Sequence, residues 1–422
     1  MNESPKPAGL FGVGELLQLF RDFQPHTKAE LSEWTGLSRS TVTQRLESLI
    51  DLGLIHPASS AASTGGRPSA QLELNPFHRL IAAVDFGATH VSVAICTLDV
   101  RILGASEREL SITEGPEVAL AVMAEEVRSL LHSIGHTAED VGAVGIGLPG
   151  PVEYSTGKPA KPPIMPGWDA FDVPERVKRD FAHVAVLVDN DVNLMALGER
   201  HVVFPDVENM IFLKVATGIG SGIIAGGELQ RGAQGTAGDI GHVRLTRGAD
   251  IQCSCGYTGC LEAVASVPAV LSEINGGGLA LTNVAGIIEA VDSGHVQAIK
   301  AVRQAGRDVG EVLTTCVSLI NPSVIVIGGS LSRAGEHLLA GVREVVYSRS
   351  MPLASQQLTI EQSIVGREAG VTGAGVTVVS NLFIYDTAAL TLFLIVFENE
   401  SFSRPISVKI LLTVAFIRIR RS

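Results

Sequence analysis

The sequence predicts an α/β protein in which a small winged helix-turn-helix domain precedes a larger domain of two lobes with a structural zinc site. Three observations support this fold class. Three helical patterns and two short strand patterns open the chain, in the order of a winged helix. Two sets of strand-like and helix-like segments follow, and each set contains a hairpin that turns on glycines. One histidine and three cysteines in the second set have the spacing of zinc ligands.

Length and charge limit the alternatives. A chain of 422 residues is too long for one ordinary core, so two or three domains are expected. The net charge of −12 argues against a protein coated in nucleic acid. The first 80 residues carry seven Lys/Arg and eight Asp/Glu, so a nucleic-acid contact there depends on a local patch.

The chain carries no sign of export or membrane insertion. Its first nine residues are polar and lack the apolar core of a signal peptide. The longest apolar stretch, residues 387–397, is shorter than the roughly 20 residues that a membrane helix needs. Three of the five cysteines lie within eight residues, which is typical of a metal site in a reducing compartment. We therefore expect a cytoplasmic protein without membrane contact.

Residues 10–75 are predicted to form the winged helix. Apolar residues recur at helical spacing in residues 12–21 and 28–35, where Trp34 is expected to face inward. Ser38 is a suitable N-cap for a third helix, which would bury Val42, Leu46, Leu49 and Ile50. Residues 54–55 and 70–74 read as strands, with the wing tip at 59–69.

The third helix and the wing supply the candidate DNA contacts. Arg67 is the only cation of the wing tip and is predicted to enter the minor groove, although residues 59–69 also fit a flexible linker. The polar face of the third helix is predicted to lie in the major groove, although it also fits a solvated face of a small bundle. Its candidate residues are Arg39, Ser40, Thr43, Gln44 and Arg45.

The two lobes are expected at residues 80–200 and 201–380, with a ligand cleft between them. Strand-like runs and long helical runs alternate in both, and a helix at 297–320 ends before Pro322. The tail, residues 381–422, is atypical and receives no role. The two glycine turns have backbone and hydroxyl donors for phosphate, although such turns are also common in ordinary hairpins. They comprise Asp85, Gly87 and Thr89 in the first and Thr217 and Gly218 in the second.

The metal ligands are His242, Cys253, Cys255 and Cys260. One imidazole and three thiolates suit tetrahedral zinc, and four protein ligands leave no open position, so the metal is predicted to be structural. Free thiols in a loop are the alternative. The metal is expected to orient Asp239, His242 and Glu262 toward the cleft.

These motifs resemble the signature of the ROK family of repressors, open reading frames and sugar kinases. The resemblance rests on Asp239 to His242, the cysteine cluster ending at Glu262, and residues 146–150, 167–168 and 189–193. It implies an actin-like (RNase H-like) two-lobed ATPase fold for residues 80–380 and a homodimer or homotetramer. A winged helix ahead of this domain is the arrangement of the family's xylose and N-acetylglucosamine repressors.

The resemblance also implies a sugar site and a nucleotide site. The sugar would be bound by Asn190, Asp191, Asp239, His242 and Glu262, although Asn190 and Asp191 also fit a helix N-cap. The family usually has Glu at position 239. Asp85, Gly87, Thr89, Thr217 and Gly218 match the two phosphate loops, and Gly328 and Gly329 the adenosine side. Ala88, His90 and Ala216 depart from the kinase pattern, which predicts weakened nucleotide binding.

The function expected from these features is a sugar-responsive, DNA-binding transcription regulator, a repressor of carbohydrate-metabolism genes. A sugar or sugar phosphate would alter the affinity for operator DNA, and Zn²⁺ would be structural. The alternative is an ATP-dependent sugar kinase that uses ATP and Mg²⁺, with Asp191 as base. The winged helix favours the regulator, because a kinase has no use for it. An oligomeric scaffold without ligand leaves the polar site unexplained.

Overall fold

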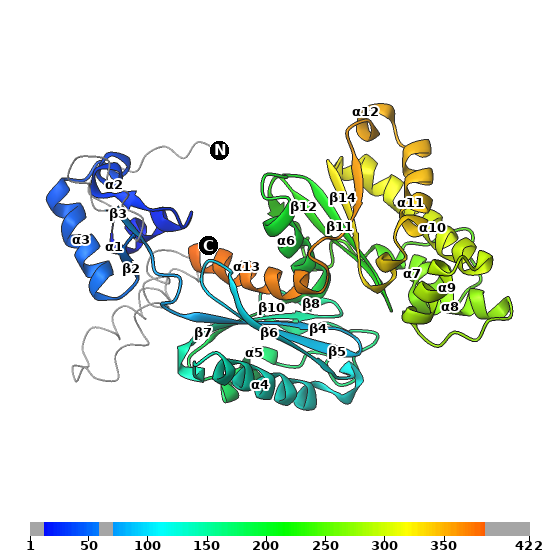
Figure 1. The fold of residues 1–422 in the computed structure, drawn as a ribbon, viewed down its shortest axis with the longest axis horizontal. Coiled ribbons are helices and arrows are strands. Elements are labelled where there is room, and N and C mark those ends of the chain that lie inside the picture. The colour runs from blue at the N-terminus through cyan, green and yellow to red at the C-terminus, as the bar shows by residue number, and fades with distance from the viewer. Residues whose placement is uncertain (1–11, 59–70, 385–422) are drawn as a thin grey trace.

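The computed structural model describes residues 12–58 and 71–384 (Figure 1). The N-terminal domain has three helices and an antiparallel sheet in the order β1-β3-β2, which is a winged-helix arrangement. The wing tip, with Arg67, lies outside the described residues. The elements are α1 (Val13–Leu17), a 3₁₀ turn (Gln18–Phe20), β1 (His26–Thr27), α2 (Lys28–Thr35), α3 (Arg39–Asp51), β2 (Ile55–Pro57) and β3 (Gln71–Leu74).

Local signals explain where these helices begin and end. The Thr27 hydroxyl accepts the Glu30 N–H at the start of α2, and Gly36 ends α2 with a φ of 67°. The Ser38 hydroxyl caps α3 as predicted. The predicted inward positions of Trp34 and Ile50 are wrong, since they are 52% and 37% exposed. The core takes Thr35 in place of Trp34, whereas Ile50 follows Leu49, which is buried as predicted.

The first sheet of the larger domain has the order β10-β7-β4-β5-β6. A hairpin and a third antiparallel strand form one side, and two parallel strands the other. The helices α4 (Pro116–Ser133) and α5 (Val173–Asp180) pack on one face. The strands are β4 (Leu80–Phe86), β5 (His90–Cys96), β6 (Ile102–Glu109), β7 (Val141–Leu148) and β10 (Ala185–Asn190), with a separate pair β8 (Val152–Glu153) and β9 (Lys158–Pro159).

The second sheet repeats this plan in the order β13-β12-β11-β14-β15, again with three antiparallel and two parallel strands. Its strands are β11 (Met210–Val215), β12 (Ile219–Ala225), β13 (Glu228–Leu229), β14 (Val324–Gly328) and β15 (Thr359–Gln362). The helices of this lobe are α7 (Leu261–Ala265), α8 (Val267–Gly276), α9 (Val284–Asp292), α10 (Val296–Ile320), α11 (Glu336–Arg349) and α12 (Pro352–Ser355). The repeated plan is the actin-like fold.

Two helices cross between the lobes. Helix α6 (Asp191–Val203) follows the first sheet but packs on the second, and α13 (Ala369–Ile384) follows the second sheet but packs on the first (Figure 1). They approach so closely that a Cβ at Gly373 would lie 1.7 Å from the Leu194 carbonyl oxygen.

Because of these two helices, the lobes do not follow the expected boundaries at residues 200 and 380. Residues 369–384 complete the first lobe, and the helix runs four residues into the segment 381–422 that was expected to be an atypical tail. The reason is a long-range apolar contact between α13 and the first sheet, which no local pattern reveals. Residues 385–422 lie outside the described residues. No helix within 12–58 and 71–384 is both long and apolar enough to cross a membrane.

Candidate metal and ligand site

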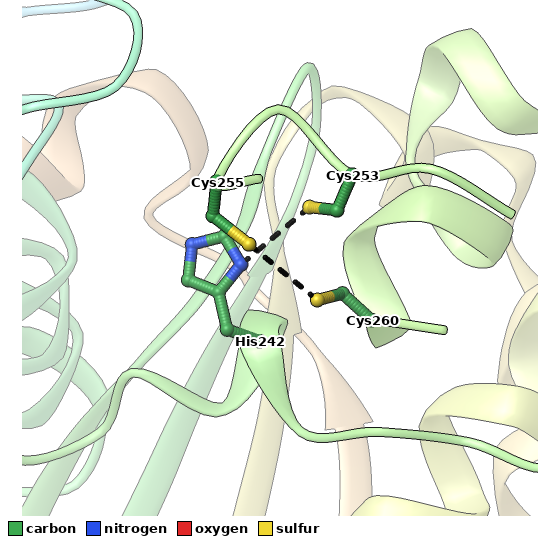
Figure 2. A group of neighbouring side chains, drawn as sticks. All are labelled: His242, Cys253, Cys255 and Cys260. Atoms are coloured by element: carbon green, nitrogen blue, oxygen red, sulfur yellow. Dashed lines mark hydrogen bonds between the residues drawn. The ribbon is translucent and has the colours of Figure 1, made fainter. Parts of the chain in front are cut away.

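The predicted metal ligands come together in the loop between β13 and α7 (Figure 2). The Sγ of Cys253 lies 3.7 Å from Nδ1 of His242, and the Sγ atoms of Cys255 and Cys260 are 3.6 Å apart. All four ligand atoms lie within 4.8 Å of one another. Three sulfurs and one nitrogen at these separations fit a tetrahedral metal ion. We call residues 239–262 the metal loop.

The thiols of the metal loop have perturbed acidities. Burial and the neighbouring sulfurs raise the pKa of Cys260 to about 12. Burial also opposes ionisation of Cys255, but hydrogen bonds from the Tyr257 backbone and the other two thiols outweigh it and lower the pKa. A metal ion bound here therefore has to displace the Cys260 proton, which couples binding to pH.

The three polar residues assigned to the metal loop are tied to it in different ways. His242 turns Nδ1 toward the sulfurs, and its Nε2 lies 3.9 Å from Oδ1 of Asp239. Glu262 accepts the Ser254 hydroxyl at 3.3 Å and the Ile219 N–H at 3.1 Å. The metal loop is thus connected to the glycine turn between β11 and β12. Ser254 is a contact that the sequence analysis did not identify.

The start of β12 connects this group to Asn190 and Asp191. A Cβ at Gly220 would lie 3.3 Å from the side chain of Val192, the residue that directly follows Asp191. On the same strand, the Ser221 N–H and hydroxyl both donate to the Gly238 carbonyl, at 2.9 and 2.8 Å. The sugar-site residues predicted from both lobes therefore border one strand.

Asn190 and Asp191 stand at the junction of β10 and α6. Asn190 caps α6 by accepting the Val192 N–H at 3.0 Å, and its amide donates to the Gly150 carbonyl at 3.0 Å. The N-cap alternative therefore describes Asn190. The preceding Asp189 accepts Arg231 at 2.7 Å and Asn193 at 2.8 Å. Arg231 also stacks on the Tyr154 ring.

Lys214 is a site residue that the sequence analysis missed. Its ammonium forms an ion pair and hydrogen bond with Oδ2 of Asp191, whose side chain is only 4% exposed. Burial and the charge of Asp191 raise the pKa of Asp85 to about 7, although Lys214 opposes this shift. The available signal was a single charged residue in the apolar run of β11. We call Asp85, Asp191 and Lys214 the lysine cluster.

Neighbouring side chains cover or hydrogen-bond several of the residues that are expected to bind a nucleotide. The His90 ring lies over Gly87, so close that a Cβ there would be 2.3 Å from it. In the second loop, the Ile219 N–H is engaged by Glu262, and Gly218 lies against the same carboxylate. Thr89 and Thr217 are exposed. Gly328, the last residue of β14, lies against Phe212, and Gly329, which follows it, lies against Val215.

The surroundings of the first loop are also acidic. An open hollow next to Thr89 and His90 is lined by Glu107, Glu109 and Glu114, together with Leu110 and Ser111. Carboxylates at this position repel a triphosphate. These three glutamates therefore oppose the binding of a phosphate group next to Thr89.

The predicted DNA face of α3 is largely accessible. Arg39, Ser40 and Gln44 are exposed, whereas Thr43 and Arg45 are half-buried. The Ser40 hydroxyl bonds to Ser38 at 2.8 Å. One guanidinium nitrogen of Arg45, Nη1, is buried without a hydrogen-bond partner in the described part of the chain. Arg39 and Gln44 are thus the freest side chains of this face.

The chain is similar to a repressor over most of its length and to a kinase over a shorter part. The xylose repressor of Caldicellulosiruptor bescii is 28% identical over 384 residues, covering 88% of this chain and 96% of the repressor. A glucokinase of Halalkalibacterium halodurans is 28% identical over 312 residues, covering 70% of this chain and 94% of the kinase.

A solved structure shares the overall fold. The crystal structure of a ROK family transcriptional regulator, a homologue of the E. coli MLC protein, covers 90% of this chain and 98% of its own, with a TM-score of 0.75 and 24% identity. The ROK family profile matches residues 81–380. With its paired actin-like sheets and its histidine–cysteine metal loop, the chain belongs to the ROK family.

Proposed function

We propose that this protein is a sugar-responsive, DNA-binding transcription regulator that represses genes of carbohydrate metabolism. One observation carries the proposal: a helix-turn-helix with an exposed polar third helix is joined to the ROK fold in one chain. The similarity to the xylose repressor covers 88% of the chain, whereas the similarity to the glucokinase covers 70%. An N-terminal domain of this kind has no part in phosphoryl transfer.

Helix α3 would lie in the major groove of operator DNA. Arg39 and Gln44 would read base edges, and Ser40, Thr43 and Arg45 would contact phosphates or bases. Arg67 would enter the minor groove. Because an operator of two half-sites needs two such helices, the protein would act as a homodimer or homotetramer in the cytoplasm.

The effector would be a sugar or a sugar phosphate bound between the lobes. Its hydroxyls would be bound by Asn190, Asp191, Asp239, His242 and Glu262. Carboxylate, amide and imidazole groups suit this role, because each hydroxyl needs a directed partner in a desolvated site. Zinc held by His242 and the three cysteines would be structural and would orient Asp239 and Glu262.

The response would be a shift between lobe arrangements. The segment from Asp189 to Asp191 is bound by two cations of the second lobe, Arg231 and Lys214. A sugar that hydrogen-bonds to Asp191 competes with one of these contacts, and therefore favours a different lobe angle. In a dimer, this angle would set the spacing of the two α3 helices and hence the operator affinity.

A sugar kinase is the second candidate. Asp191 stands where the family's kinases have their base, and glucokinases are among the relatives. Against this reading, Asp191 is already paired with Lys214, and the His90 ring lies over Gly87. ATP and Mg²⁺ would serve as cofactors only under this alternative.

The test uses the full chain. A thermal-shift screen against common sugars and their phosphates identifies an effector, and selection from random oligonucleotides identifies the operator. Gel shifts with and without the effector should then show an affinity change, while a coupled ADP assay with the same sugars should stay at background. Sugar-dependent ADP release without operator binding would support the kinase instead.

A further inference from the structure

The lysine cluster lies where the two lobes meet. Asp85 is the last residue but one of β4 in the first sheet, Asp191 begins α6, and Lys214 belongs to β11 of the second sheet. Lys214 continues the side-chain stripe of Met210 and Phe212, which pack against α6. A lysine at the end of an apolar stripe is costly to bury, so its partners have to compensate.

We propose that Lys214 is a built-in counter-ion, which supplies the charge that a divalent cation would otherwise bring to Asp85 and Asp191 and so keeps a metal–nucleotide complex out of this protein. The inference deepens the proposed function, because it explains how a kinase-like fold can bind a sugar without phosphorylating it.

The two carboxylates need a cation. Asp85 is 4% exposed and Asp191 is 3% exposed. Oδ1 of Asp85 is buried and has no hydrogen-bond partner within the described residues. Burial, then the charge of Asp191, raise the pKa of Asp85, while the charge of Lys214 lowers it. The site is therefore an acidic pocket in which Lys214 is the compensating charge.

The neighbouring backbone makes room for this arrangement. Glycines flank Lys214 in both sheet registers, Gly220 on β12 and Gly328 on β14. Gly147 and Gly370 leave the Asp85 carboxylate its space, since a Cβ at Gly370 would lie 2.2 Å from Oδ2. Side chains at Gly147 and Gly370 would collide with the Asp85 carboxylate.

The lysine charge opposes a second cation. Burial alone would lower the pKa of Lys214, but the charges of Asp191 and Asp85 and the hydrogen bond to Asp191 outweigh it and raise it. Lys214 therefore stays protonated at neutral pH. A divalent ion at a few ångströms from this ammonium is repelled by several kcal/mol at an effective dielectric constant of about 20. Burial lowers the pKa of the nearby His90, so this ring adds no charge at neutral pH.

The experiment measures binding of Mn²⁺ alone by electron paramagnetic resonance, with the full-length protein at pH 7.5. Lys214→Gln keeps a donor for Asp191 but removes the charge. We expect it to bind one Mn²⁺ at least about tenfold more tightly than the wild type, because the repulsion is gone. Adding Asp85→Asn should abolish this gain. Lys300→Gln, at an exposed lysine of α10, should bind Mn²⁺ like the wild type.

Two results would overturn the inference. One is equal Mn²⁺ affinity in Lys214→Gln and the wild type, and the other is a tighter site that survives Asp85→Asn. Bound metal in the metal loop and the thermal midpoint establish that each variant is folded, and Lys214→Ala repeats the test without an amide. Neither sugar nor operator DNA is used, so failure here is separate from failure of the proposed regulator.

Discussion

The metal loop and the lysine cluster both gather ionisable groups, but they balance charge differently. The metal loop brings three thiols and an imidazole to one point and contains no compensating cation among them. The lysine cluster has two buried carboxylates and carries its cation on β11. The first site depends on an external ion, and the second is complete within the chain. Metal removal should therefore affect the metal loop and leave the lysine cluster unchanged.

Loss of one thiol should have the largest effect. We expect Cys255→Ser to lose bound metal and several kcal/mol of unfolding free energy, because the loop then keeps only three ligands. Metal analysis and denaturant unfolding measure both quantities. Cys316→Ser, at a half-buried thiol of α10 outside the metal loop, should keep its metal. A metal-free Cys255→Ser protein of unchanged stability would remove the contrast between the two sites.

Removal of the internal cation should have the next largest effect. Lys214→Met leaves the Asp191 carboxylate buried without its partner, which should cost about 3–5 kcal/mol of unfolding free energy. A chelator should lower the stability of both proteins through the metal loop. The difference in unfolding free energy between Lys214→Met and the wild type should therefore stay the same. Denaturant unfolding of both proteins, with and without chelator, gives the comparison. A cost below about 1 kcal/mol would place the ion pair with ordinary surface pairs.

The acidity of Asp85 makes a pH-dependent difference. Its pKa is about 7 in the folded protein and 3.8 for an ordinary aspartate, so the folded state holds the extra proton between these values. The stability that this group contributes is therefore present below pH 4 and is lost as pH rises toward 7. We expect Asp85→Asn to improve relative to the wild type by about 1–3 kcal/mol between pH 5 and pH 8. If the two proteins differ by the same unfolding free energy at pH 5 and at pH 8, the raised pKa of Asp85 is contradicted.

The last effect, which concerns operator binding and not folding stability, belongs to a region outside both clusters. Arg39→Ala removes one exposed side chain that is proposed to contact a base edge, and it should weaken binding of the selected operator by about 1–3 kcal/mol without changing effector affinity. Gel shifts and calorimetry measure the two affinities. Arg349→Ala, at an exposed arginine of α11, is the control. If Arg39→Ala changes only effector affinity, α3 is not the DNA-contacting helix.

The sequence predicted short-range features of the structure but not its long-range contacts. The bounds of α2, the Ser38 cap and the four metal-loop ligands follow from short-range chemistry, because spacing alone brings them together. The contact of α13 with the first sheet joins residues almost 300 positions apart. Lys214 meets Asp191 only after both lobes form, so the run around it read as an ordinary strand.

Helix α13 belongs to the packing of both ends of the proposed signalling route. At its start, Gly370 lies against the Asp85 carboxylate. Farther along, Val378 and Leu382 share one apolar cluster with Leu46 and Leu72 of the winged helix. Its 16 residues span roughly 24 Å as one rigid rod. A tilt that begins beside a titratable carboxylate would therefore be carried mechanically to the base of the DNA-reading domain, without relying on a disordered tether.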